Sequence, residues 1–132
     1  ISYLTIEKKG PPTNVLADKM GDWFFGCDIC QTVCPWNEKI FQFSNNKKPN
    51  ETAERSQLVD QLNKILRSSN KSLQKRFMNT PLSRPRGRGL KRNALVVIGN
   101  LQLAECCEAV ERVKNEVPEL RELCDWVLEK IN

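Results

Sequence analysis

The chain has 132 residues, of which 39% are hydrophobic and 28% are charged, and its formal net charge is +5 at pH 7. A chain of this length buries one modest core, so we expect one compact unit with an appendage. It contains no histidine, which excludes Cys/His zinc sites and histidine acid–base chemistry within these residues.

The first residues read like the interior of a longer protein. The chain opens at Ile1, and its first methionine is Met20. It shows neither the pattern of a signal peptide nor an apolar stretch long enough to span a membrane. We therefore expect the C-terminal piece of a longer cytoplasmic protein that is monomeric and has no membrane partner.

Residues 27–35 carry the most informative motif. Cys27, Cys30 and Cys34 are followed by Pro35 in the pattern C-x2-C-x3-C-P. This is the final part of the C-x2-C-x2-C-x3-C-P run of bacterial two-cluster ferredoxins, where the cysteine before the proline binds the other cluster. We predict that Cys27 and Cys30 bind one [4Fe–4S] cluster and that Cys34 binds a second. The remaining ligands must come from outside this motif.

The first 50 residues have few periodic apolar positions and many glycines and prolines, and they end in a polar run over residues 45–50. We predict that residues 1–50 are the C-terminal part of a ferredoxin-type domain, built as loops around the clusters. Aromatic side chains flank the cysteines and either shield a cluster from water or form a small core beneath the loop. They are Trp23, Phe24, Phe25 and Trp36.

From residue 51 onward, apolar residues recur with a helical period. They predict one helix over Leu58–Leu66 with Ser56 as its N-cap, and a short second helix at Leu73 and Phe77. Three further apolar stripes follow: Ala94, Val97, Ile98 and Leu101; then Cys106, Ala109, Val110 and Val113; then Cys124, Val127, Leu128 and Ile131. Short helices joined by short turns indicate a HEAT-like helical repeat domain over residues 51–132, in a mainly α protein.

The cysteines of the helical stripes differ in kind from those of the motif. Cys106 and Cys124 occupy apolar positions, so we predict that they are buried packing residues rather than ligands. A reducing compartment fits this use of cysteine better than a disulfide framework does.

Positive charge gathers in residues 69–92, which contain eight lysines and arginines and no acidic residue. Within this segment a loop shaped by proline and glycine presents three arginines, and a helix is expected to begin near Gly89. A solvated surface is the ordinary explanation for scattered lysines, but a concentrated patch is typical of phosphate binding. We predict an RNA-binding surface that comprises Arg84, Arg86, Arg88, Lys91 and Arg92.

Three segments resemble epoxyqueuosine reductases: residues 1–7, ISYLTIE; residues 26–37, GCDICQTVCPWN; and residues 92–100, RNALVVIGN. The family reduces an epoxide on the modified wobble base of tRNA, in the last step of queuosine synthesis. The resemblance implies an upstream cobalamin-binding catalytic domain, then two [4Fe–4S] clusters, then HEAT-type repeats.

The resemblance also implies two partners, namely tRNA with a modified wobble base and a cellular electron donor. The family has a further cysteine directly before its first motif, one residue upstream of Ile1. We assign no catalytic residue to this chain and expect it to be inactive by itself. Arg92 and Asn93 match the family's repeat motif, where the asparagine caps or bridges turns.

Three other interpretations remain open from the sequence. The first is the electron-transfer segment of another corrinoid iron–sulfur reductase, such as a reductive dehalogenase. The second is a non-enzymatic helical repeat interaction module with a structural zinc, which would want four ligands. The third is a plain ferredoxin-type carrier, which has no need of the basic helices.

Overall fold

The computed structural model describes residues 1–38 and 51–132. The polar run at residues 45–50 lies outside the described residues, as does the predicted boundary between two domains at residue 50. That boundary therefore stays a prediction. The described residues form helices and connecting turns without a β-strand, which confirms the mainly α prediction.

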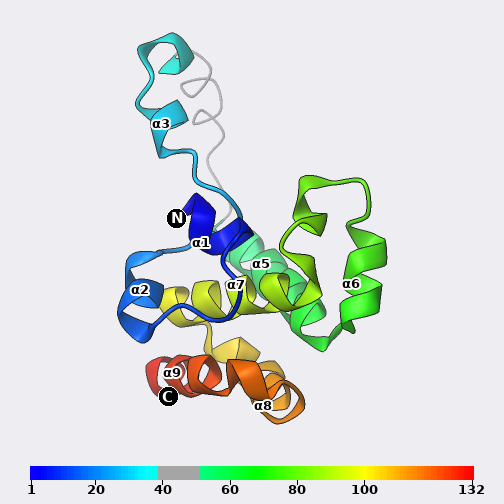
Figure 1. The fold of residues 1–132 in the computed structure, drawn as a ribbon. Helices are drawn as coiled ribbons and strands as arrows, with labels where there is room; N and C mark the ends of the chain where they lie inside the picture. The colour runs from blue at the N-terminus through cyan, green and yellow to red at the C-terminus, as the bar shows by residue number, and fades with distance from the viewer. Residues whose placement is uncertain (39–50) are drawn as a thin grey trace.

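Helix α7 (Arg86–Leu101) lies at the centre of the molecule (Figure 1). Its residues from Gly89 to Gly99 are all buried, because other helices cover it on several sides. It packs against α5 (Glu51–Arg67), α6 (Asn70–Arg76) and α9 (Arg121–Ile131). Gln102 ends the helix in a left-handed conformation with φ +50°, a common helix C-terminus.

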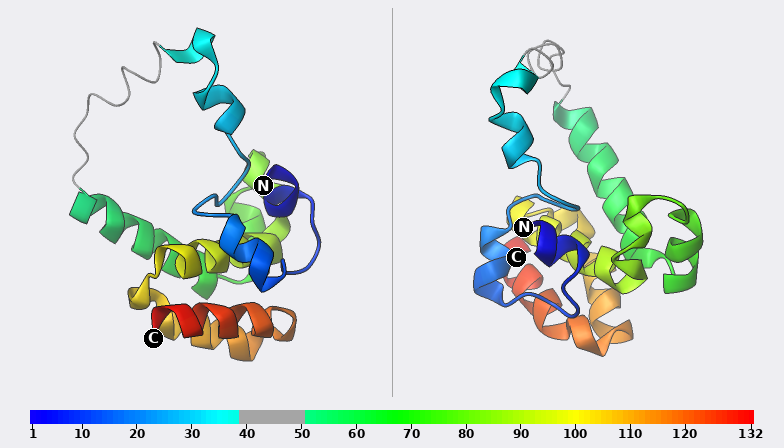
Figure 2. Two further views of the ribbon diagram at one scale, coloured as in Figure 1. Left: turned by 90° about the vertical axis from the view of Figure 1, so that its left-hand side faces the viewer. Right: turned by 45° about the horizontal axis from the view of Figure 1, so that its top comes forward.

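Helices α8 (Cys107–Glu116) and α9 form a pair, in which α9 packs against α7 and α8 packs against α5 (Figure 2). Short 3-10 turns lead into both: η3 (Ala104–Cys106) and η4 (Pro118–Leu120). Pro118 occupies the first turn of η4, where its missing N–H leaves no hydrogen bond unmade. A further turn, η2 (Pro81–Ser83), precedes α7.

The N-terminal residues are built into this helical body. Helices α1 (Ser2–Ile6) and α2 (Asn14–Lys19) both pack against α7. After Gly26 the chain leaves the body and forms a projection that carries α3 (Ile29–Thr32) and η1 (Pro35–Asn37) (Figures 1 and 2). We call residues 26–38 the cysteine arm.

The structure corrects two predicted helix starts. Helix α5 begins at Glu51, so Ser56 lies inside it and is not its N-cap. Helix α7 begins at Arg86 rather than near Gly89, and Pro85 is the residue directly before it. Cys106 and Cys124 are fully buried in the core, as predicted. In the part of the chain that the structure describes, no helix combines the length and the apolar character needed to cross a bilayer.

Candidate functional site

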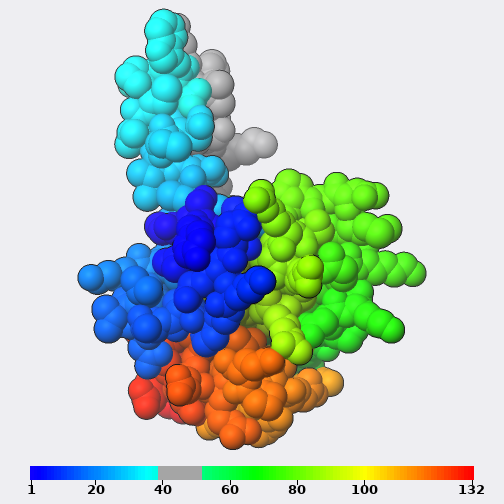
Figure 3. All heavy atoms as spheres, in the orientation of Figure 1, coloured from blue at the N-terminus to red at the C-terminus, as the bar shows by residue number. Residues whose placement is uncertain are grey.

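The cysteine arm carries all three cysteines of the motif away from the helical body (Figure 3). Cys30 is exposed, whereas Cys27 and Cys34 are half-buried. Hydrogen bonds within the arm hold its two short turns, including those from Cys34 N–H to the carbonyl of Gln31 and from Asn37 N–H to the carbonyl of Cys34. Among the described residues, no three His, Cys, Asp or Glu side chains converge as a complete metal site.

The aromatic residues near the motif divide into two groups. Phe24 packs against the hydrophobic core, so it belongs to the body beneath the arm. Trp36 is 91% exposed at the far end of the arm. Phe24 thus fits the small-core interpretation, and Trp36 covers nothing within the described residues.

Two hydrogen-bonded contacts hold the root of the arm on the body. The Asn93 side-chain amide of α7 donates to the carbonyl of Phe24 at 2.9 Å and to that of Thr5 at 2.8 Å. The Gly26 N–H donates to the Thr5 hydroxyl oxygen at 3.0 Å. Gly26 has φ +73°, a conformation that glycine adopts without strain.

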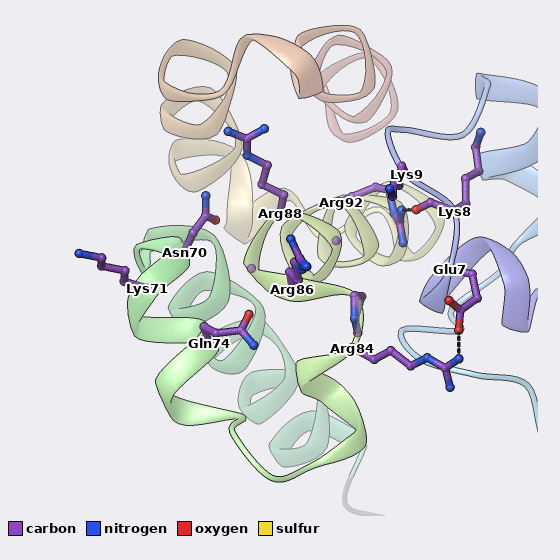
Figure 4. A pocket seen from close by; sticks show the side chains of 13 residues that line it. Glu7, Lys8, Lys9, Asn70, Lys71, Gln74, Arg84, Arg86, Arg88 and Arg92 are labelled. Carbon is purple, nitrogen blue, oxygen red and sulfur yellow. Dashed lines mark hydrogen bonds and ion pairs between the residues drawn. The ribbon is translucent and has the colours of Figure 1, made fainter.

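A second feature is an open groove of about 750 Å³ beside the start of α7 (Figure 4). Three stretches distant in the sequence line it: residues 7–9, α6 and residues 84–92. Its cationic residues are Lys8, Lys9, Lys71, Arg84, Arg86, Arg88 and Arg92. The carboxylate of Glu7 also lines it. We call this feature the basic groove.

Lys8 and Lys9 were not among the predicted RNA-binding residues. They lie far from residues 69–92 in the sequence and reach the groove only because residues 7–10 fold over α7. In the sequence they appear only as an adjacent pair of lysines before Gly10-Pro11. Such a pair is too common to indicate an RNA-binding site by itself.

Two groove arginines have acidic partners, which come from outside residues 69–92. Arg84 pairs with Glu7 at 2.7 Å, and Arg88 pairs with Glu119 at 2.7 Å. All four side chains are well exposed, so each pair contributes little to stability and exchanges readily for another anion. Arg86 makes no ion pair with a described residue.

The structure also separates Lys91 and Arg92 from the other three predicted cations. Lys91 is 4% exposed and Arg92 is 3% exposed. Burial lowers the pKa of Lys91, which the charge of Glu116 partly offsets. Neither residue lies in the first turn of α7, which contains Arg86 and Arg88 instead. Lys91 is thus buried in this structure, and its predicted RNA contact stays a prediction.

Arg92 lines the groove wall, but its guanidinium is engaged by the backbone. It donates to the carbonyls of Thr5 at 3.0 Å, of Gly10 at 3.3 Å and of Lys8. Burial lowers its pKa, and these carbonyl oxygens take the place of water around the charge. Arg92 thus holds residues 5–10 in place, and its predicted phosphate contact stays a prediction.

Comparison with known proteins addresses the identity of the chain. Residues 1–37 match the family described as "4Fe-4S double cluster binding domain". Proteins named epoxyqueuosine reductase from Francisella cf. novicida and Pseudomonas aeruginosa are 33% and 32% identical to it over 98% of this chain. This chain is a relative of the epoxyqueuosine reductases.

A further epoxyqueuosine reductase, from Leadbetterella byssophila, is 40% identical over 74% of this chain. The chain covers 30% of that protein and 36% of each of the other two, about a third of their length. No solved structure gives a match. The relatives carry an oxidoreductase name, and the family match places residues 1–37 in an iron–sulfur domain.

Proposed function

We propose that the chain is the C-terminal part of an epoxyqueuosine reductase, which reduces epoxyqueuosine to queuosine in tRNA. In this proposal an upstream domain binds cobalamin and supplies the catalytic groups. The cysteine arm supplies ligands to two [4Fe–4S] clusters, and the helical body binds tRNA. The match of residues 1–37 to a double-cluster domain is the observation that carries the proposal.

The residues of the arm fit a share of a cluster site. Thiolate sulfur is the donor that [4Fe–4S] clusters take, and each cluster takes four cysteines. Cys27 and Cys30 would bind one cluster and Cys34 the other, with the missing ligands supplied from upstream. Bound clusters would supply single electrons at low potential. The task of this chain is then to hold the three thiolates in place.

The basic groove supports the RNA-binding part of the proposal. Seven cationic side chains face one carboxylate along its walls, and an RNA phosphate can replace Glu7 or Glu119 beside an exposed arginine. The short helices around α7 would form HEAT-like repeats that recognise tRNA by shape and phosphate. Arg84, Arg86 and Arg88 are the predicted residues that remain accessible for this contact, with Lys8, Lys9 and Lys71 beside them.

The test compares two double variants of the full-length reductase. Arg86→Ala with Arg88→Ala removes two guanidiniums from the groove. Arg55→Ala with Arg67→Ala removes two exposed guanidiniums from α5, which pair with Glu105 and Glu108. We expect only the groove variant to weaken tRNA binding and to lower the slope of affinity against salt concentration. Equal affinities for the two variants would overturn the groove assignment.

A matched measurement tests the cluster assignment. Cys27→Ser, Cys30→Ser and Cys34→Ser in the full-length reductase should each lower the iron and sulfide content after anaerobic reconstitution. Cys107→Ser changes a partly buried cysteine of α8 and should leave that content unchanged. Wild-type iron content in all three arm variants would show that the arm does not bind the clusters.

A further inference from the structure

The only side-chain hydrogen bonds that join the root of the arm to the helical body, among described residues, involve Thr5 and Asn93. Both residues are fully buried. Together they bind the backbone at Phe24 and at Gly26, the residue directly before Cys27. The other hydrogen bonds described for residues 27–37 stay within the arm. The position of Cys27 relative to α7 therefore depends on this small network.

Both N–H donors of the Asn93 amide are used in this network. Its Nδ2 donates both protons, to the carbonyls of Thr5 and Phe24. Its Oδ1 accepts from Arg92 Nε at 3.0 Å. Because Arg92 Nε can only donate, this contact fixes which end of the amide faces the two carbonyls.

Thr5 links Asn93 to the arm through its own hydrogen bonds. Its carbonyl accepts from Asn93 and from Arg92 Nη2, and its hydroxyl oxygen accepts from the Gly26 N–H. The hydroxyl proton is directed to the carbonyls of Ile1 and Ser2, at 3.2 and 3.1 Å. A serine could make the same contacts, whereas a valine of the same shape could not accept from Gly26.

We propose that Asn93 and Thr5 are positioning residues for the cluster ligand Cys27. The inference rests on the proposed cluster function of the arm. Residues that hydrogen-bond around the ligands of a metal site orient those ligands, and their loss typically lowers metal affinity by about 10- to 100-fold. Asn93 and Thr5 act one step further away, through the backbone that leads into the ligand.

Helix α7 provides a matched control for Asn93. Asn100 also donates two hydrogen bonds to carbonyls, of Ala17 and Gly21, each at 2.8 Å. These carbonyls belong to α2 and the turn after it and lie further from the arm along the chain than those of the root, because Gly21 is five residues before Gly26. Asn93→Ala and Asn100→Ala therefore each remove two amide-to-carbonyl hydrogen bonds from the same helix. Asn93→Ala also removes the bond from Arg92, and only this variant removes a bond to the root of the arm.

The experiment measures loss of iron to a chelator and the electron paramagnetic resonance spectrum of the reduced clusters in the full-length reductase. We expect Asn93→Ala and Thr5→Val to release iron about tenfold faster than wild type and to shift the spectrum. Asn100→Ala and Thr5→Ser should keep the wild-type rate and spectrum. A thermal melt of each variant separates these effects from general destabilisation.

Equal rates and spectra for Asn93→Ala and Asn100→Ala would overturn the proposal, as would equal values for Thr5→Val and Thr5→Ser. Should Asn93→Ala fail to fold, the two Thr5 variants decide the question. Failure of the underlying cluster function is recognised separately, because Cys27→Ser would then retain its full iron content. The positioning role can therefore fail while the cluster assignment stands.

Discussion

The indole ring of Trp126 lies directly over Gly99, where α9 crosses α7. A Cβ atom built on Gly99 would meet Cζ3 of the ring, with Cη2 at 2.7 Å and Cε3 at 3.1 Å. Contacts this short require one of the helices to move. The packing of α9 on α7 therefore requires a glycine, which has no side chain, at position 99.

Gly99→Ala should destabilise the protein by about 1–3 kcal/mol, the usual cost of overpacking a core. The sign is informative, because alanine normally stabilises a helix interior by about 1 kcal/mol relative to glycine. Urea unfolding measures the difference. Adding Trp126→Leu should remove most of the further cost of Gly99→Ala, and a stabilising Gly99→Ala would contradict the close packing.

Arg86 has φ +60°, a conformation that costs a non-glycine residue roughly 1–3 kcal/mol. Arg86→Gly should therefore raise the free energy of unfolding by about 1 kcal/mol. From the proposed role of the groove, it should also weaken tRNA binding by the full-length reductase. Chemical denaturation and binding measurements at several salt concentrations check the two effects. Arg86→Ala serves as the control, because it removes the same charge without relieving the backbone. Loss of stability in Arg86→Gly would rule out strain at this residue.

The thiols of Cys106 and Cys124 should remain protonated in the folded protein well above neutral pH. Burial raises the pKa of Cys106 to about 11 and that of Cys124 to about 12 from an ordinary value of 9.0. Because the unfolded thiols lose their protons first, the free energy of unfolding should fall as pH rises above 9.0. Unfolding measured between pH 8 and 10 (about one unit on each side) tests this slope.

The control for the thiols is the double variant Cys106→Ala with Cys124→Ala. Each replacement should cost about 1–2 kcal/mol at neutral pH, and the double variant should lose stability less steeply above pH 9.0. Burial lowers the pKa of Lys91, so its contribution makes the free energy of unfolding rise with pH. Lys91 is present in both proteins, so its contribution cancels in the comparison. Identical slopes would show that the two thiols do not titrate as buried groups. Iron content of the full-length reductase should not change.

This chain, purified alone, should hold no stable [4Fe–4S] cluster, because the proposed assignment divides the three cysteines of the arm between two clusters. Iron and sulfide analysis after anaerobic reconstitution is the measurement. The full-length reductase treated in parallel shows that the procedure works. Near-stoichiometric clusters bound by Cys27, Cys30 and Cys34 alone would contradict the division of ligands between two sites.

Local patterns in the sequence were enough to predict the helical class and the burial of Cys106 and Cys124. They also gave the candidate cluster ligands, which stay a prediction. Each depends on spacing within a few residues. The period of apolar residues also located the cores of α5, α8 and α9. The starts of α5 and α7 could not be placed in this way, because apolar periodicity marks the buried face and their first turns are polar.

The network around Arg92 shows what sequence could not supply. Charge counting groups Arg92 with Arg86 and Arg88, yet tertiary packing buries it against residues 5–10. The partners Glu7 and Glu119 of the groove arginines are likewise distant in the sequence. A charge pattern predicts where cations are concentrated along the chain, and only the fold decides which of them face the solvent.

Asn93 and Asn100 are seven residues apart on one helix, slightly less than two full turns. Both amides hold N-terminal segments of the chain, one at Thr5 and Phe24 and the other at Ala17 and Gly21. A single-residue insertion between them would rotate one amide by about 100° relative to the other. The length of this part of α7 is therefore fixed, and evolutionary insertions should fall in the surface connections instead.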